Sequence, residues 1–167
     1  IVQLIYHHSI NIMGIVETKI KLGKQDNVHF KKLPHWDFLT NSNSNSTNRI
    51  WLTWNPCKAK VHILHEDKQW LHVLIEDIQN SKLLTATFVY GRHTINDRKS
   101  LWHFITSIAT SIHIPWVVLG DFNEVTGPNE ISGDNTPWTS GMTDFADCLN
   151  EACLLDLRYT GQLYTWS

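Results

Sequence analysis

The sequence contains few cysteines, no long hydrophobic run and no excess of positive charge. Cys57, Cys148 and Cys153 include no CxxC pair, so we expect neither a disulfide framework nor a zinc site, but three reduced thiols of an intracellular protein. No apolar stretch approaches the roughly 20 residues of a transmembrane helix, and no membrane partner is expected. The Gly-rich patterns GxGxxG and GxxxxGK[ST] are both absent, which argues against a Rossmann or P-loop nucleotide site.

The composition is that of one globular domain, because 42% of the 167 residues are hydrophobic and only 18% are charged. The net charge of -2 counts mildly against a nucleic-acid partner, which usually meets a basic protein. Basic residues are nevertheless grouped locally. For each group, a contact with phosphates and a solvated surface remain open readings; the members are Lys19, Lys21, Lys24, Lys31 and Lys32 in one group, and Arg92, Arg98 and Lys99 in the other.

Hydrophobic periodicity predicts a chain that mixes strands and helices. Short apolar or alternating runs predict strands over 10–16, 49–54, 59–64, 70–78, 83–90, 116–119 and 163–166. Helical spacing predicts helices over 97–113 and 142–153, and residues 1–9 read as the end of another. Segments 41–48 and 124–140 are predicted loops. The helices do not alternate strictly with the strands, which favours a layered sandwich over a Rossmann fold.

Chemically useful side chains follow three of the predicted strands. Glu17 comes after the first, Tyr90 ends another, and Asp121 and Asn123 follow the apolar run 116–119 within Gly-Asp-Phe-Asn. Each is unremarkable alone, since a charged strand exit, a half-buried tyrosine and a turn are the commoner explanations. Their joint occurrence at strand ends predicts a rigidly built site.

These motifs resemble, in their order, those of the endonuclease/exonuclease/phosphatase superfamily, which includes deoxyribonuclease I. Longer stretches are similar to the endonuclease of plant LINE-type retrotransposons, notably GIVETKI, RIWLTWNP, VYGRHTINDRKSLW and VVLGDFNEV. The resemblance covers nearly the whole chain. It implies a four-layered α/β sandwich in which helices flank two packed mixed sheets.

The resemblance also implies a set of site residues. Glu17 would bind a divalent metal, Mg²⁺ or Mn²⁺, while Asp121 would orient or deprotonate the attacking water. Asn123 would hold the phosphate, and Tyr90 would donate a hydrogen bond to a phosphate oxygen. Thr165 and Trp166 would line the substrate groove, with Arg92 as a further substrate-binding residue. Chemically, a hard cation with carboxylate and water ligands suits phosphodiester hydrolysis.

The resemblance implies a Mg²⁺-dependent DNA endonuclease, acting in the nucleus ahead of a reverse-transcriptase domain in the same polypeptide. The family's upstream Asn and downstream Ser-Asp-His do not occur in residues 1–167, so we expect a domain truncated at both ends whose fragment alone is inactive. Two alternatives stay open: a noncatalytic retroelement remnant or binding module, and a phosphoesterase for another substrate on the same fold.

Overall fold

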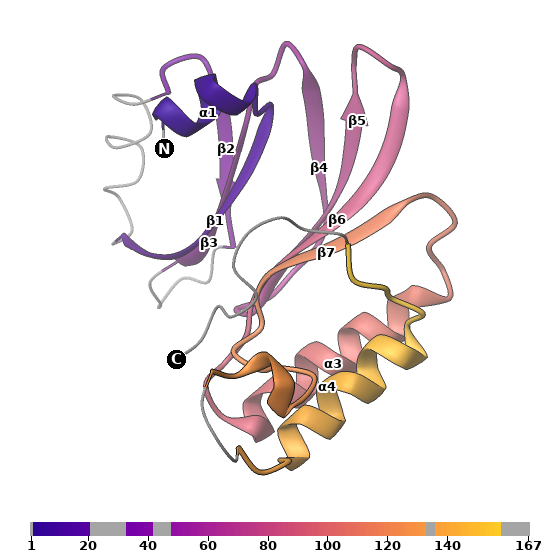
Figure 1. The fold of residues 1–167 in the computed structure, drawn as a ribbon. Coiled ribbons are helices and arrows are strands. Elements are labelled where there is room, and N and C mark those ends of the chain that lie inside the picture. Colours follow the sequence, from indigo (N-terminus) through magenta and orange to yellow (C-terminus); the bar gives the residue numbers. More distant parts are fainter. Residues whose placement is uncertain (1, 21–32, 42–47, 133–135, 158–167) are drawn as a thin grey trace. The chain divides into compact units, whose positions relative to one another are not determined.

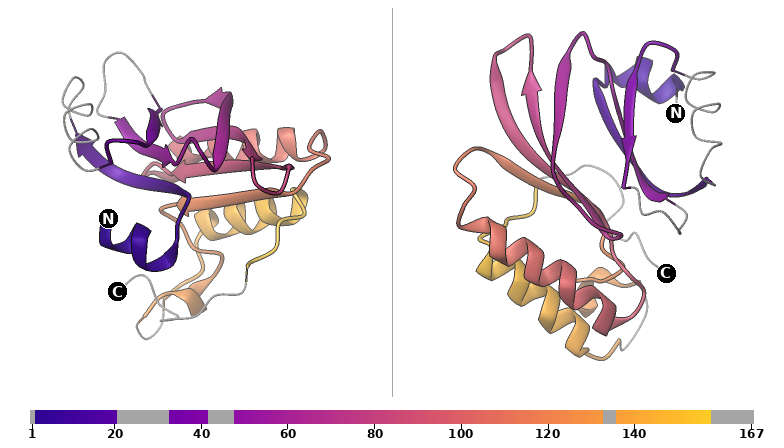
Figure 2. Two further views of the ribbon diagram at one scale, coloured as in Figure 1. Left: turned by 90° about the horizontal axis from the view of Figure 1, so that it is seen from above. Right: turned by 180° about the vertical axis from the view of Figure 1, so that it is seen from behind.

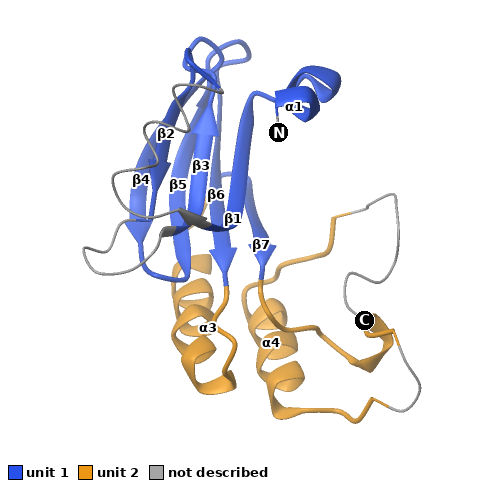
Figure 3. Ribbon diagram, turned by 90° about the vertical axis from the view of Figure 1, so that its left-hand side faces the viewer, with its two compact units in different colours: residues 1–90, 114–121 blue, residues 91–113, 122–167 orange. Residues whose placement is uncertain are grey.

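The computed structural model describes residues 2–20, 33–41, 48–132 and 136–157. The chain divides into two compact units (Figures 1 and 3), and each is described by itself. Unit 1 comprises residues 1–90 and 114–121, and unit 2 comprises residues 91–113 and 122–167. The predicted strand 163–166, with the candidate residues Thr165 and Trp166, lies outside the described residues.

Unit 1 begins with the short helix α1 (Val2–His8), as the sequence predicts, followed by an antiparallel sheet. Its strands have the order β1-β3-β2; their bounds are Ile12–Ile20 for β1, Asp37–Thr40 for β2 and Asn48–Trp54 for β3. The sequence patterns do not predict β2, which is only four residues long. The strand predicted over 10–16 ends too early, because β1 continues through Glu17 to Ile20.

The second sheet of unit 1 is mixed and has the order β4-β5-β6-β7. Its strands span Ala59–Glu66, Trp70–Asp77, Lys82–Tyr90 and Trp116–Asp121. Neighbours are antiparallel from β4 to β6, as their short connections predict, whereas β6 and β7 are parallel. Parallel strands require a crossover connection, and here residues 91–113 supply it.

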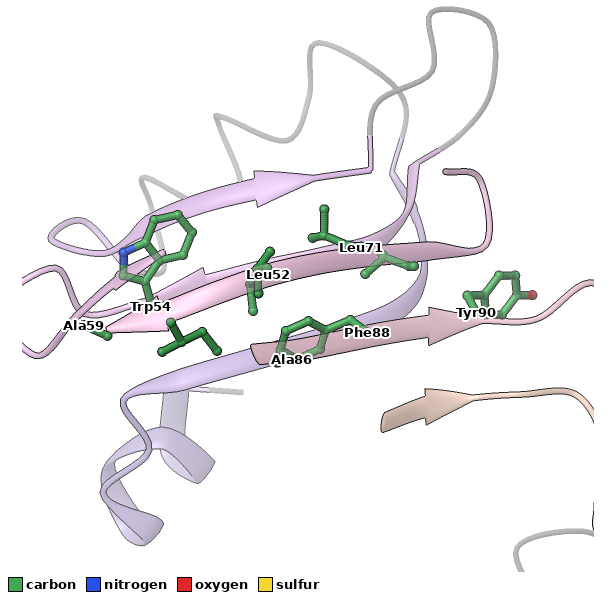
Figure 4. Packing of buried hydrophobic residues seen from close by; sticks show 10 residues of the cluster. Leu52, Trp54, Ala59, Leu71, Ala86, Phe88 and Tyr90 are labelled. Atoms are coloured by element: carbon green, nitrogen blue, oxygen red, sulfur yellow. The ribbon is translucent and has the colours of Figure 1, made fainter. Parts of the chain in front are cut away.

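The two sheets, drawn as ribbons in Figure 2, pack face to face through a hydrophobic cluster (Figure 4). Leu52 of β3 and Leu71 of β5 are fully buried in it, and Phe88 and Tyr90 of β6 extend it toward one end. Residues at every second position of a strand share a face, so the alternation of Leu71 and Val73 puts both in this core. The strand predicted over 70–78 is confirmed as β5.

The opposite face of the mixed sheet carries a buried polar network. His72 Nδ1 lies 2.8 Å from Thr87 Oγ1, which also accepts a hydrogen bond of 2.9 Å from Trp116 Nε1. Burial, and to a smaller degree the nearby His65, lower the pKa of His72 below its usual value. Burial therefore favours the neutral form of the His72 imidazole.

Unit 2 contains the packed helices α3 (Ile95–Ala109) and α4 (Ser140–Glu151), together with the 3₁₀ turn η1 (Pro128–Glu130) inside the predicted loop 124–140. Each α-helix starts at a threonine cap: Thr94 accepts from Asp97 N and Thr139 from Met142 N. Both helices were predicted, but α3 ends at Ala109, short of 113. None of the helices described is long and apolar enough to cross a membrane.

An aromatic stack joins α3, α4 and the segment that follows β7. The ring centroids of Trp102 and Phe145 lie 4.8 Å apart, and those of Phe122 and Phe145 lie 4.9 Å apart. Such stacks add to the energy of apolar burial. Phe122, the third residue of the Gly-Asp-Phe-Asn motif, is thus a packing residue of unit 2.

Candidate functional site

Tyr90 and Asp121 are register partners at the last positions of the parallel strands β6 and β7. Partners in adjacent strands point to the same face of a sheet. Tyr90 belongs to the core between the sheets, and Val117 packs against that core from the face of β7 that Asp121 shares. The structure thus brings these two predicted site residues together, with Tyr90 only 5% exposed and Asp121 half-buried.

The glycine before Asp121 is required by the backbone. Gly120 has φ +141°, and a Cβ built there would lie 2.0 Å from Val89 O of β6. Only glycine combines that backbone angle with such a close approach. Gly120 therefore lets β7 stay beside β6 up to the carboxylate of Asp121.

Glu17 lies at an irregularity in β1. The register of β1 against β3 shifts between Val16 and Ile20, and Glu17 has φ 59°. A non-glycine residue in the left-handed region is strained, and such strain occurs often at functional sites. β-Bulges likewise redirect side chains beside active sites. Glu17 is exposed, which suits a carboxylate that binds a ligand from solvent.

The pairing of β1 with β3 shows which end of unit 1 holds Glu17. Val16 is the partner of Ile50, and the preceding Arg49 places its guanidinium carbon 5.6 Å from the centroid of the Tyr90 ring. The bulge at Glu17 therefore begins where β3 reaches Tyr90. Glu17 therefore lies toward the same end of unit 1 as Tyr90 and Asp121.

Asn123 and Arg92 belong to unit 2. Asn123 has φ 51° and donates a hydrogen bond of 2.7 Å from Nδ2 to Gly91 O. A Cβ at Gly91 would lie 2.2 Å from Phe122 O, so the segments after β6 and β7 touch directly. Asn123 is thus fixed in a strained conformation by the segment after Tyr90, whereas Arg92 is exposed on that segment.

Both readings predicted for Arg98, a phosphate contact and a solvated charge beside Arg92 and Lys99, are wrong. Arg98 is 3% exposed and forms an ion pair with Glu124. Its Nη1 also donates to Arg92 O at 2.8 Å and to His93 O at 3.0 Å. Arg98 therefore ties the segment after β6 to the residue after Asn123, and it has a structural role.

The carboxylates of Glu17 and Asp121 suit Mg²⁺ better than zinc or calcium. Within the described ranges, no three His, Cys, Asp or Glu side chains are grouped closely enough to hold a metal ion. A zinc or calcium cage needs several protein ligands, whereas Mg²⁺ keeps most of its waters and uses one or two carboxylates. Glu17 and Asp121 at one end of unit 1 match the second requirement.

No protein-family model matches the sequence, and the search of curated proteins found no match. Solved structures do match. The endonuclease domain of TRAS1, a telomere-specific non-LTR retrotransposon, superposes with a TM-score of 0.67 at 11% identity, covering 90% of this chain and 64% of that one. The chain has the fold of the endonuclease/exonuclease/phosphatase proteins.

Two bacterial proteins support the same fold. An endonuclease/exonuclease/phosphatase from Bacteroides vulgatus matches with a TM-score of 0.56 at 19% identity, covering 77% of this chain and 57% of that one. The mannosyl-6-phosphatase Bt3783 of Bacteroides thetaiotaomicron matches at 0.53 and 12%, covering 73% and 54%. The α/β sandwich prediction is confirmed. The chain spans between half and two thirds of the length of these proteins.

Proposed function

We propose that this chain is the DNA-nicking endonuclease domain of a LINE-type retrotransposon, hydrolysing phosphodiesters with the help of Mg²⁺ or Mn²⁺. The observation that carries the proposal is the convergence of Glu17, Tyr90 and Asp121 on one end of a sandwich whose solved relatives include a retrotransposon endonuclease. DNA is the proposed partner, in the nucleus, and a reverse transcriptase follows in the same polypeptide.

The chemistry of each side chain suits the role that the resemblance implies. Glu17 is the carboxylate that would hold the metal, which supplies positive charge against the phosphate. Asp121 accepts a proton from the attacking water and orients it. Tyr90 donates its phenolic hydrogen to a phosphate oxygen, and a neutral donor adds no charge that would need burial. Asn123 would hold the phosphate, and Arg92 would be a further substrate-binding residue.

The test is a plasmid-nicking assay with the polypeptide encoded by the complete open reading frame, because the solved relatives are longer than this chain. We expect nicked circles with Mg²⁺ or Mn²⁺ and none with EDTA. Asp121→Asn should slow nicking by roughly 10²–10⁴-fold, the usual contribution of a general base, with an unchanged circular dichroism spectrum. Glu17→Gln should raise the Mg²⁺ concentration needed for half-maximal rate.

A phosphoesterase acting on another substrate is the second candidate, since a mannosyl-6-phosphatase shares the fold. Comparing DNA nicking with phosphate release from sugar phosphates and from phosphoinositides distinguishes the two candidate functions. Release without nicking would favour the second candidate. Neither activity, from a folded protein with either metal, would leave the noncatalytic binding module as the explanation.

A further inference from the structure

The guanidinium of Arg49 lies over the ring of Tyr90, and the sequence motifs assign no role to this arginine. The guanidinium carbon of Arg49 is 5.6 Å from the centroid of the Tyr90 ring, within the range of a cation–π contact. Arg49 is half-buried and is the second residue of β3, the central strand of the three-stranded sheet, whereas Tyr90 is the last residue of β6 in the mixed sheet. The contact therefore spans the two sheets of unit 1.

The backbone of Arg49 is anchored by a buried amide. Asn41 is 6% exposed, and its Oδ1 accepts hydrogen bonds from Arg49 N at 3.3 Å and from Ile50 N at 2.9 Å. Its Nδ2 donates to Asp67 O at 3.0 Å and to Lys68 O at 3.1 Å. Asn41 thus clamps the start of β3 to the turn between β4 and β5.

The same turn holds Tyr90. Gln69, the next residue of the turn, is 3% exposed, and its carbonyl oxygen accepts a hydrogen bond of 2.8 Å from Tyr90 N. Arg49 and Tyr90 are therefore both attached, through buried polar groups, to one short segment. A contact closed in this way is preorganised, so little entropy is lost when a ligand uses it.

We propose that Arg49 is a substrate-binding residue that holds a phosphate of the nucleic acid beside the Tyr90 hydroxyl; this assignment rests on the proposed function. Glu17 and Asp121 converge on the same end of unit 1 and repel an anionic phosphodiester. A fixed guanidinium offsets that repulsion, and its planar fork matches phosphate oxygens. Its stacking on Tyr90 also holds the phenol ring in place.

Binding in EDTA tests the proposal apart from catalysis. The complete protein and its Arg49→Gln variant are titrated with a short fluorescent DNA duplex at several salt concentrations. We expect the variant to bind about tenfold more weakly or worse, the scale of a lost charge-assisted hydrogen bond. The slope of log affinity against log salt should fall by about 0.9, the contribution of one phosphate contact.

Two further variants give the controls. Lys82→Gln removes a positive charge from the first residue of β6, at the opposite end of the strand from Tyr90. This variant should change neither the affinity for the duplex nor the salt slope. Arg49→Lys keeps the charge without the planar fork, so it should keep the salt slope while binding more weakly than wild type. Arg49→Met serves if the Gln variant does not fold, because its stem still covers the ring.

The outcomes separate the two proposals. Equal affinity and salt slope in wild type and the neutral Arg49 variant would overturn the role of Arg49, whatever the nicking assay shows. Absence of duplex binding by the wild type would overturn it as well. Duplex binding that depends on Arg49 in a protein that never nicks would support the phosphate contact and refute the endonuclease.

Discussion

Gly14 of β1 lies against the ring of Phe88 of β6, so closely that a Cβ built at Gly14 would be 2.3 Å from Phe88 Cδ1. Phe88 is 5% exposed and cannot easily move aside. We expect Gly14→Ala to lower the free energy of unfolding by about 1–3 kcal/mol, the usual cost of overpacking a core. Urea unfolding measures the change.

The double variant Gly14→Ala/Phe88→Leu provides the control. The smaller leucine leaves room for the new methyl group, so the double variant should lose less stability than the sum of the two single losses. Strictly additive losses would show that the two positions are not in contact, and β1 would then pack differently against β6.

The ion pair of Arg98 and Glu124 predicts a large effect of removing either partner alone. Their side chains are only 4% and 11% exposed, so Glu124→Gln or Arg98→Met leaves a buried charge without its counterpart. We expect each to lower the free energy of unfolding by about 3–5 kcal/mol. Chemical denaturation of the purified variants measures this.

An exposed pair serves as the comparison for this prediction. Lys60 Nζ lies 3.4 Å from Glu76 Oε2, and the two side chains are 59% and 38% exposed. Lys60→Met should therefore change stability by less than about 1 kcal/mol. Similar losses at Arg98 and at Lys60 would contradict the structural role assigned to Arg98.

Local sequence patterns predicted much of this fold because the relevant forces act between near neighbours. The alternation of Leu71, His72 and Val73 identified β5, and helical spacing around Leu101 and Ile105 identified α3. β2 escaped detection, since four residues give too little periodicity. Its strand character comes from pairing with β3, which is a tertiary contact.

The buried His72 predicts a loss of stability in acid. Burial lowers the pKa of His72 in the folded protein, so below its ordinary value the unfolded chain binds more protons than the folded one. The contribution of His72 to stability is thus fully present above about pH 6.5. It is lost as the pH falls through the lowered pKa of His72 in the folded protein. Thermal unfolding between pH 7.5 and about 5 measures the trend.

His72→Gln isolates the contribution of this histidine, because glutamine can hydrogen-bond to Thr87 but does not titrate there. Its stability should depend less on pH than that of the wild type across the same interval. Parallel pH profiles for the two proteins would show that other groups cause the acid sensitivity.

The three cysteines should differ sharply in reactivity. Cys57 and Cys153 are exposed, whereas Cys148 is buried, and burial, aided by Glu151, raises the pKa of its thiol to about 12. Thiolate is the reactive form, so a thiol reagent at pH 8 should label two sites quickly and Cys148 only in denaturant. Mass spectrometry of labelled peptides identifies the sites, and rapid labelling of Cys148 would contradict the packing of α3 against α4.

The candidate site could be predicted in part, for a related reason. Tyr90 and Asp121 are the last residues of strands that the sequence predicts, and parallel pairing brings them together, whereas Glu17 lies inside β1 at its irregularity. Arg49 and Arg98 could not be assigned in this way. What each arginine does depends on a partner brought close by the fold, Tyr90 for one and Glu124 for the other.

The left-handed backbone at Glu17 and Asn123 sets thermostability against activity at these two positions. Side chains other than glycine adopt such angles at a cost of roughly 1–2 kcal/mol. Selection of variants for heat resistance alone would therefore favour glycine at positions 17 and 123. It would enrich for molecules that survive heating and have lost both the exposed carboxylate and the amide held by Gly91.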